Sequence, residues 1–321
     1  KKQGLQNNTV VSLAVTAQGN VWIGLDNGID YAALDAAFSV FYPDGEQQGT
    51  GYAIQQHEGQ LYFGTNTGLF ALDWQRYYSL QQRERFVRVR NADGQVWSLN
   101  VIGHDLLMGH HEGAFRIRKL QAERITSPQG IWKFLPLSPD MLIAGYYEGL
   151  LSFRKEGDAW KMDGKYADFS ESSRLLAMKD TVIWMAHPYR GVYRIVPHPA
   201  RHTLSVSFMG RAQQLPSDLG NQLFQLQQQI LFTGSKGVFQ YDPVRGIFVP
   251  DSSFVQIFGS DVPVYYLAQD KNGHIWYQTA QETGVLLIEA GTLKKKVVRV
   301  PIPELKKRLT NGFQCVYPVD S

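Results

Sequence analysis

The sequence predicts an all-β protein, a seven-bladed β-propeller of four-stranded antiparallel blades. Three observations support this fold class. A pattern of apolar segments and paired glycines recurs about every forty residues along the 321-residue chain. Each copy contains several short apolar segments separated by turn residues, as short strands require. No periodic segment of helical length lies between the copies.

Each copy has an apolar first strand, a second strand that usually ends in glycine, and a second glycine that opens a third strand. In the first copy these features are Val10–Val15, Val21–Gly24 and Gly28. The second glycines stand at 28, 68, 113, 149, 191, 237 and 284, with intervals of 40, 45, 36, 42, 46 and 47 residues. Such glycines suit a tight turn into the third strand.

A further apolar strand follows the third one in several copies. Examples are Phe38–Tyr42, Phe86–Val89 and Val297–Val300. Four short antiparallel strands in each copy correspond to one propeller blade. One blade cannot bury both of its faces, so the copies are expected to stack around a ring.

The repeats place one propeller over residues 1–310, with copies near 4–46, 47–90, 91–126, 127–168, 169–215, 216–258 and 259–304. Residues 311–321 include Phe313–Tyr317, which has the pattern of a first strand. Two interpretations follow. Either an eighth copy starts here and the ring belongs to a longer chain, which we favour, or this strand closes the ring.

The composition is that of a globular protein, with 44% hydrophobic, 19% charged and 12% aromatic residues. The formal net charge of +3 argues against a dedicated nucleic-acid surface. No apolar stretch reaches the length of a membrane span, and the chain opens on Lys1–Gly4 without a signal peptide. Cys315 is the single cysteine, which excludes an internal disulfide.

Two basic runs are expected on the solvated face of outer strands, where charge protects a sheet edge. They comprise Arg83, Arg85, Arg88 and Arg90 in one run, and Lys294, Lys295, Lys296 and Arg299 in the other.

One segment identifies the repeat. Gly-Leu-x-Asn-Asn-x-Val over Gly4–Val10, followed by Gly19–Gly24 and Gly28–Ile29, resembles the two-component regulator propeller repeat. That family occurs in the periplasmic sensor regions of bacterial hybrid histidine kinases and of related one-component transcription regulators. Gly109–Gly113 and His187–Tyr193 resemble the one-component branch, which carries a triple-tyrosine domain downstream.

The resemblance implies a periplasmic ligand-sensing domain of a signal-transduction regulator, commonly for glycan-derived ligands. In that family such propellers come in pairs, followed by an immunoglobulin-like domain, a membrane span and a cytoplasmic output. The implied partners are an oligosaccharide or other small molecule, further domains of the same receptor, and a second copy of the chain. The resemblance supplies no ligand residues that could be carried over.

The loops between second and third strands share one face of a propeller with the connections between blades, and ligands bind on this face. Tyr rings can stack on sugar rings, while Glu, His and Arg bind hydroxyl or acidic groups. The candidate ligand-binding residues are His110, His111, Glu112, Tyr146, Tyr147, Glu148, His187, Tyr189, Arg190, Asp26, Asn27, Asn66 and Lys236. The alternative is that these are solvated loop tips, or that the tyrosines pack between blades.

No catalytic residue, metal or cofactor is expected. His110 and His111 are adjacent and have no third His or Cys ligand at a supporting spacing. A propeller glycoside hydrolase or lyase is the alternative function, and Glu112 and Glu148 are the one matched carboxylate pair on the ligand face. A protein-interaction or dimerisation propeller is the second alternative. Asp93–Trp97 is expected to be an ordinary turn between blades.

Overall fold

The computed structural model describes residues 9–17, 21–32, 41–44, 50–74, 86–288, 297–306 and 316–317. The chain forms two compact units, residues 1–42 and residues 43–321. Both units are built from antiparallel strands, as the sequence predicts. Each unit is described separately below.

The first unit is a three-stranded antiparallel sheet of β1 (Val10–Val15), β2 (Val21–Leu25) and β3 (Gly28–Ala32). These strands are the three predicted for the first copy. The predicted fourth strand falls mainly on residues 33–40, which lie outside the described residues. Leu13 on β1 is 65% exposed, and Val11 and Val15 are exposed as well.

The second unit contains six sets of four strands within the described residues, which we name sheets I to VI. Sheet I contains β4 (Gly51–His57), β5 (Gln60–Thr65), β6 (Gly68–Asp73) and β7 (Val87–Asp93). Sheet II contains β8 (Val96–Ile102), β9 (Asp105–His110), β10 (Gly113–Arg118) and β11 (Gln121–Arg124). Sheet III contains β12 (Lys133–Ser138), β13 (Met141–Tyr146), β14 (Gly149–Glu156) and β15 (Ala159–Lys165).

The remaining three sets follow the same order. Sheet IV contains β16 (Leu175–Lys179), β17 (Val182–His187), β18 (Gly191–His198) and β19 (Thr203–Met209). Sheet V contains β20 (Gln222–Leu226), β21 (Gln229–Gly234), β22 (Gly237–Asp242) and β23 (Ile247–Pro250). Sheet VI contains β24 (Val264–Gln269), β25 (Ile275–Thr279), β26 (Thr283–Ile288) and β27 (Val297–Pro301).

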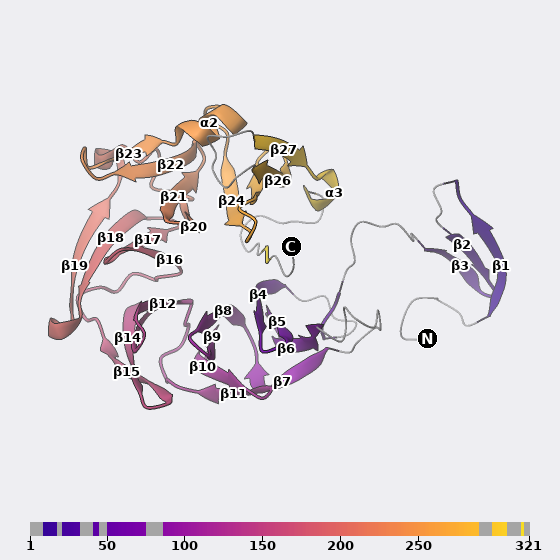
Figure 1. The fold of residues 1–321 in the computed structure, drawn as a ribbon, viewed down its shortest axis with the longest axis horizontal. Helices are drawn as coiled ribbons and strands as arrows, with labels where there is room; N and C mark the ends of the chain where they lie inside the picture. The colour runs from indigo at the N-terminus through magenta and orange to yellow at the C-terminus, as the bar shows by residue number, and fades with distance from the viewer. Residues whose placement is uncertain are drawn as a thin grey trace. The chain divides into compact units, whose positions relative to one another are not determined.

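The six sheets of the second unit are arranged as propeller blades. The first strand of each sheet contacts the first strand of the next, from β4 through β8, β12, β16 and β20 to β24. Figure 1 shows these strands on the inner side and the fourth strands, such as β15 and β19, on the outer side. The predicted four-stranded blade is therefore confirmed for these copies. The predicted turn at Asp93–Trp97 is also confirmed, because it joins β7 to β8.

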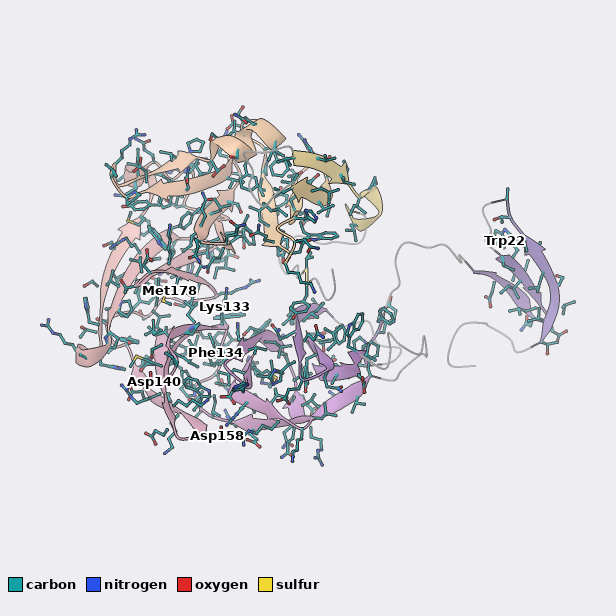
Figure 2. The ribbon with its side chains drawn as sticks, viewed as in Figure 1. Trp22, Lys133, Phe134, Asp140, Asp158 and Met178 are labelled. Atoms are coloured by element: carbon teal, nitrogen blue, oxygen red, sulfur yellow. The ribbon has the colours of Figure 1, made fainter. Side chains whose placement is uncertain are left out.

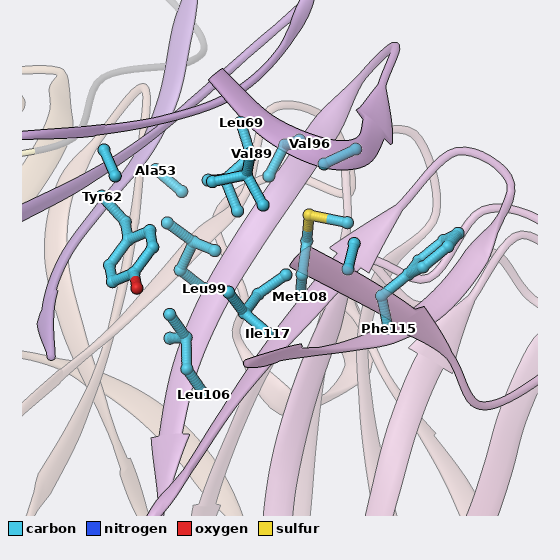
Figure 3. Close-up of a cluster of buried hydrophobic side chains, with 13 residues drawn as sticks. Ala53, Tyr62, Leu69, Val89, Val96, Leu99, Leu106, Met108, Phe115 and Ile117 are labelled. Atoms are coloured by element: carbon cyan, nitrogen blue, oxygen red, sulfur yellow. The ribbon is translucent and has the colours of Figure 1, made fainter. Parts of the chain in front are cut away.

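Apolar side chains between neighbouring sheets form the core. One cluster combines Leu69 and Val89 of sheet I with Leu99, Met108 and Ile117 of sheet II (Figure 3). Similar clusters lie between the later sheets. Burial between the sheets explains why each predicted strand carries apolar residues on both faces.

The recurring second glycine has a clear steric cause at Gly149, the first residue of β14. Its φ is 123°, in the region that glycine adopts readily. A Cβ there would also collide with the carbonyl of Phe169. Gly284 is the exception, because it lies one residue inside β26 and has no positive φ.

Sheets I and II are joined at their outer strands. β7 pairs with β11 in parallel through Arg90 and Gln121, so the eight strands form one sheet. Arg88 and Arg90 of the predicted basic run lie on β7 and are exposed, and Arg88 forms an ion pair with Asp93 at 2.7 Å. The outer edge of sheet I, which the sequence predicts to be protected by charge alone, is therefore partly paired with sheet II. Arg83, Arg85 and Lys294–Lys296 lie outside the described residues.

Two short α-helices lie among the strands of the described part, α2 (Ser252–Phe258) and α3 (Pro303–Lys306), and two 3₁₀ helices cover Pro199–Arg201 and Arg211–Gln213. Asp251 caps α2 by accepting hydrogen bonds from the backbone N–H groups of Ser253 and Phe254. Among the described helices, none has both the length and the apolar composition that a membrane crossing needs.

Residues near the C-terminus contact both the first and the last sheet of the second unit. The backbone N–H of Val316 donates to the hydroxyl of Tyr266 on β24 at 3.0 Å. The hydroxyl of Tyr317 bonds to the side-chain amide of Gln55 at 2.9 Å and accepts from the backbone N–H of Gln56 at 3.1 Å, both on β4. Residues 313–315 of the predicted terminal strand lie outside the described residues.

Candidate ligand-binding site

In each sheet the first and second strands pair residue by residue. We compare the residue that comes immediately before the first uninterrupted pair on the first strand. Gly64, Gly109 and Gly145 pair with Ala53, Ser98 and Lys133, respectively. The residues just before these partners are Tyr52, Trp97 and Trp132. The same alignment gives Arg174 in sheet IV, Asn221 in sheet V, Tyr265 in sheet VI and Val11 on β1. We call this the entry position.

At several entry positions the residue forms a β-bulge, because it is an additional residue of the first strand opposite the second strand. The register shifts between Gly51 and Ala53 on β4, and between Val96 and Ser98 on β8. Such a bulge turns the extra side chain away from the alternation of the strand, and bulges are common beside functional sites. The entry position lies at the end of the blade that also carries the loops between second and third strands. The hydrogen bond from the N–H of His111 to the carbonyl of Gln95 shows this proximity directly.

The entry positions of sheets I to III carry aromatic side chains that contact one another. The ring centroids of Tyr52 and Trp97 are 4.9 Å apart, and those of Trp97 and Trp132 are 4.7 Å apart. All three side chains are half-buried. Three consecutive blades therefore present a continuous aromatic surface that is still accessible to solvent.

Two predicted loop residues extend this surface. The rings of Trp132 and Tyr147 are 5.1 Å apart, and the Tyr147 hydroxyl bonds to Nδ1 of His111 at 2.9 Å. Gly130 lies against the Tyr147 ring, where a Cβ would collide with it. Burial raises the pKa of Tyr147, so its hydroxyl stays protonated and able to donate at neutral pH. We call Tyr52, Trp97, Trp132, Tyr147 and His111 the aromatic arc.

Cationic side chains lie beside one end of the arc. The guanidinium carbon of Arg174 is 5.6 Å from the centre of the Trp132 ring, which is cation–π geometry. The amine of Lys133 donates to the carbonyl of Leu176 at 2.9 Å, in the neighbouring sheet. Burial lowers the pKa of both groups, and Tyr52 acts in the opposite direction on Arg174. Figure 2 shows Lys133 on the inner side of this unit, with Asp158 at its periphery.

A second polar cluster surrounds Glu171, in the connection between sheets III and IV. Arg190 donates to the Glu171 carboxylate at 2.5 Å, and Nε2 of His187 lies 3.9 Å from it. Burial lowers the pKa of His187, although the Glu171 charge opposes this shift. Tyr189 lies in the loop between β17 and β18, next to Arg190, and is 75% exposed. Ser172, next to Glu171, accepts a hydrogen bond from the indole of Trp132 at 3.2 Å. The connection between sheets III and IV therefore contacts both the aromatic arc and the cluster around Glu171.

Two of the predicted loop residues are buried strand ends. His110 closes β9 and is 1% exposed, and Tyr146 closes β13 and is 3% exposed. Nδ1 of His110 accepts from the backbone N–H of Glu112 at 3.0 Å, and its ring packs on Phe115. Burial lowers the pKa of His110. The strands run one residue further than the sequence pattern indicates, which turns both side chains into the interior.

Most other predicted candidates have local structural contacts. Glu148 forms an ion pair with Lys165 at 3.1 Å, and Lys236 forms one with Asp261 at 3.0 Å. Asn66 accepts from the backbone N–H of Thr50 at 2.8 Å. Glu112 is exposed, and its backbone carbonyl accepts from Arg124.

Asp26 and Asn27 form the turn between β2 and β3 of the first unit, and both are exposed. They belong to a different compact unit from the aromatic arc.

Sequence reasoning missed Tyr52, Trp97, Trp132 and Arg174. The signal was present, because each residue lies at the start of a first strand or just before it, at the same place in its copy. Aligning the copies on the end of the second strand rather than on the second glycine alone would have exposed the series.

A cavity of about 250 Å³ lies elsewhere, between sheets IV and V. It lies at the other end of the blades, since it is lined by Lys179 and Asp180 of the β16–β17 turn and by Gln229 at the start of β21. Its Trp184 wall packs on Phe232 and Tyr241 as part of the core. Among the described residues, no group of three or more His, Cys, Asp or Glu side chains could hold a metal ion.

The fold and the repeat agree with a known class of protein. The second unit is built of β-propeller blades, and the family model described as Two component regulator propeller matches residues 4–27. The resemblance seen in the sequence is thereby confirmed. No curated protein matches the chain.

Several solved structures share the fold. The extracellular domain of the hybrid two-component system BT3049 from B. thetaiotaomicron superposes with a TM-score of 0.63 at 15% identity, over 96% of this chain and 42% of that one. The extracellular domain of BT4673 from the same organism gives 0.60 at 14% identity, over 94% and 42%. PorZ, a surface component of the type-IX secretion system of Porphyromonas gingivalis, gives 0.53 at 13% identity, over 94% and 48%. The chain thus spans less than half the length of these proteins.

Proposed function

We propose that this chain is a ligand-sensing propeller from the extracytoplasmic, periplasmic part of a bacterial one- or two-component regulator, and that it detects a glycan-derived ligand without catalysing a reaction. The observation that carries the proposal is the aromatic arc at the entry positions of three consecutive blades. The match over residues 4–27 and the fold shared with extracellular domains of BT3049 and BT4673 support the sensing role.

The arc has the chemistry that sugar binding needs. One face of a pyranose ring exposes C–H groups that pack on aromatic rings, while the hydroxyl groups at its edge need hydrogen-bond partners. Trp97 and Trp132 offer the packing surface, with centroids 4.7 Å apart. Tyr147 and His111 offer hydroxyl and imidazole groups next to it. Half-buried aromatic rings also lose little conformational entropy when a ligand binds.

The described carboxylates favour binding over hydrolysis. A glycosidase uses two carboxyl groups placed on either side of the scissile bond. Glu148 forms an ion pair with Lys165, and Glu171 forms one with Arg190. We therefore propose that kinase or transcriptional output is carried by other parts of the receptor. The proposed partners are a second propeller, an immunoglobulin-like domain and a second receptor copy.

We also propose that the first repeat contributes a seventh blade. Leu13 on β1 aligns with Leu99, Phe134, Leu176, Leu223 and Leu267, each less than 9% exposed in its sheet, whereas Leu13 is 65% exposed. Stacking β1–β3 into a ring of blades would bury this position. Leu13→Asp should then lower the melting temperature of the whole chain by several degrees, while Asp26→Asn should not. An unchanged melting temperature for Leu13→Asp would contradict a seventh blade.

The sensing proposal can be tested by titrating oligosaccharides of defined composition into the chain in a calorimeter. Trp132→Ala should weaken binding of a recognised oligosaccharide at least about tenfold, or about 1.4 kcal/mol. Phe208→Ala is the control, because Phe208 is an exposed aromatic residue on β19, outside the arc. Binding that survives Trp132→Ala unchanged would remove the arc from the site. Hydrolysis of the oligosaccharide would replace sensing with catalysis.

A further inference from the structure

The entry positions differ in chemistry around the second unit. Sheets I to III carry Tyr52, Trp97 and Trp132, whereas sheets IV to VI carry Arg174, Asn221 and Tyr265. Across all the aligned entry positions, including Val11 on β1, Arg174 is the charged residue and no carboxylate occurs. Three aromatic entry positions are therefore followed by the polar residues Arg174 and Asn221, of which the first carries a positive charge.

A second cation lies at the same junction. Lys133 follows Trp132 in the chain, and its amine crosses from sheet III to the carbonyl of Leu176 in sheet IV. Leu176 is two residues after Arg174. Both cations therefore belong to the boundary between these two sheets, and Arg174 lies over the Trp132 ring.

The hydrogen bond between Lys133 and the Leu176 carbonyl does not neutralise the charge of the lysine. A partly buried ammonium group is usually paired with a carboxylate, because removing a charge from water is costly. Within the described part of the chain, Lys133 instead donates to a neutral carbonyl, and this bond uses one of its three N–H groups. The carboxylate of Glu171, three residues before Arg174, is bound by Arg190 at 2.5 Å.

We propose that the sugar recognised at the aromatic arc carries a carboxylate, as in an oligosaccharide that contains uronic acid. Arg174 and Lys133 bind the carboxylate, and Trp132 and Trp97 pack against the sugar ring. This inference rests on the proposed sensing function and adds the charge of the ligand. Guanidinium matches a planar carboxylate with two parallel hydrogen bonds, which gives Arg174 the leading role.

The test compares oligouronides with the same oligosaccharides after carboxyl reduction, which changes each carboxylate to a hydroxymethyl group and nothing else. Calorimetric titration of the unmodified chain should show that an acidic oligosaccharide binds at least tenfold more tightly than its reduced form. The preference should shrink as salt concentration rises. Arg174→Gln and Lys133→Met should each weaken binding of the acidic form much more than binding of the reduced form, so that the preference falls severalfold.

Arg245→Gln is the matched control, because Arg245 is exposed in the turn between β22 and β23, at the other end of the blade. Equal affinity for acidic and reduced forms would overturn the inference while leaving sugar sensing intact. An equal loss of preference in Arg245→Gln would also overturn it, by showing a general charge effect. If neither form of any oligosaccharide binds, the sensing proposal itself fails. Should Arg174→Gln not fold, the comparison of the two ligands on the unmodified chain still decides.

Discussion

At the scale of single residues, Trp132 connects several groups of the candidate site. Its ring contacts Trp97 of sheet II and Tyr147 of its own sheet, and its indole N–H donates to Ser172 before sheet IV. Arg174 lies over its face. One side chain thus fixes the relative positions of groups from three blades. A substitution there alters the geometry of the arc as well as its surface, which is why affinity and folding must be measured together.

Lys133 gives a residue-scale prediction about pH. Burial lowers its pKa below the ordinary lysine value of 10.5. The unfolded chain then binds more protons than the folded chain between the lowered pKa and 10.5, so the free energy of unfolding rises with pH in that window. Lys133→Met should remove this rise and increase stability at neutral pH. Urea unfolding at a series of pH values measures both effects.

Lys179→Met is the control for this experiment, because Lys179 is exposed at the end of β16. It should retain the full rise of stability with pH. If Lys133→Met shows the same pH dependence as the unmodified chain, the Lys133 amine is not the group responsible.

At the scale of elements, the connection before β16 and the ion pairs between sheets decide how neighbouring blades fit together. Residues 168–174 support the arc through Ser172 and hold the His187–Arg190 loop through Glu171. At the other end of the blades, Asp105 of β9 binds Lys155 of β14 and Trp160 of β15, each at 2.9 Å, and it also pairs with Arg116. Asp105 is 3% exposed, so this network is a buried link between sheets II and III.

Asp105→Asn should destabilise the chain by about 3–5 kcal/mol, because it leaves buried cations without their anion. Burial alone would raise the pKa of Asp105, but the bonds from Lys155 and Trp160 and the charge of Arg116 lower it overall. The stability from ionised Asp105 is therefore present above the ordinary value of 3.8 and is lost as pH falls through the lowered pKa. Thermal unfolding between neutral and acid pH should show this loss.

Asp180→Asn serves as the comparison, since Asp180 is exposed in the β16–β17 turn and asparagine tolerates its φ of 55°. It should change stability little at any pH. Equal effects of the two substitutions would mean that the sheet II–III network does not contribute to stability.

At the scale of the whole molecule, a propeller has to join its last blade to its first. The hydrogen bonds of Val316 and Tyr317 connect β24 and β4 of the second unit. We propose that this link helps to close a ring that also contains the proposed seventh blade, in line with the less favoured of the two sequence interpretations. The Tyr317 hydroxyl takes part in two of these three bonds.

Tyr317→Phe removes the hydroxyl alone and should cost about 1–2 kcal/mol, since each hydrogen bond contributes about 1 kcal/mol. For a chain of this size the melting temperature should fall by about 2–4 °C. Tyr189→Phe is the control, because Tyr189 is 75% exposed. An unchanged melting temperature in Tyr317→Phe would show that these bonds do not hold the first and last sheets together.

The sequence predicted the strands well because each blade is specified locally. The turn glycines, such as Gly149, and the apolar strands follow short-range rules of conformation and burial. The candidate site was predicted only in part. His111 and Tyr147 lie together as expected, whereas His110 and Tyr146 are buried because their strands extend through them. Loop boundaries shift by a residue easily, and one residue decides whether a side chain faces the interior.

The sequence by itself determined the blade, its repeat and the loops that share one end of it. Only the tertiary structure decided which residues meet there. Tyr52, Trp97, Trp132 and Arg174 are separated by 45, 35 and 42 residues in the chain and belong to four different sheets. They are brought together by the register of the first strands and the packing of neighbouring sheets. Those pairings depend on contacts between distant segments, which a local pattern in one sequence does not encode.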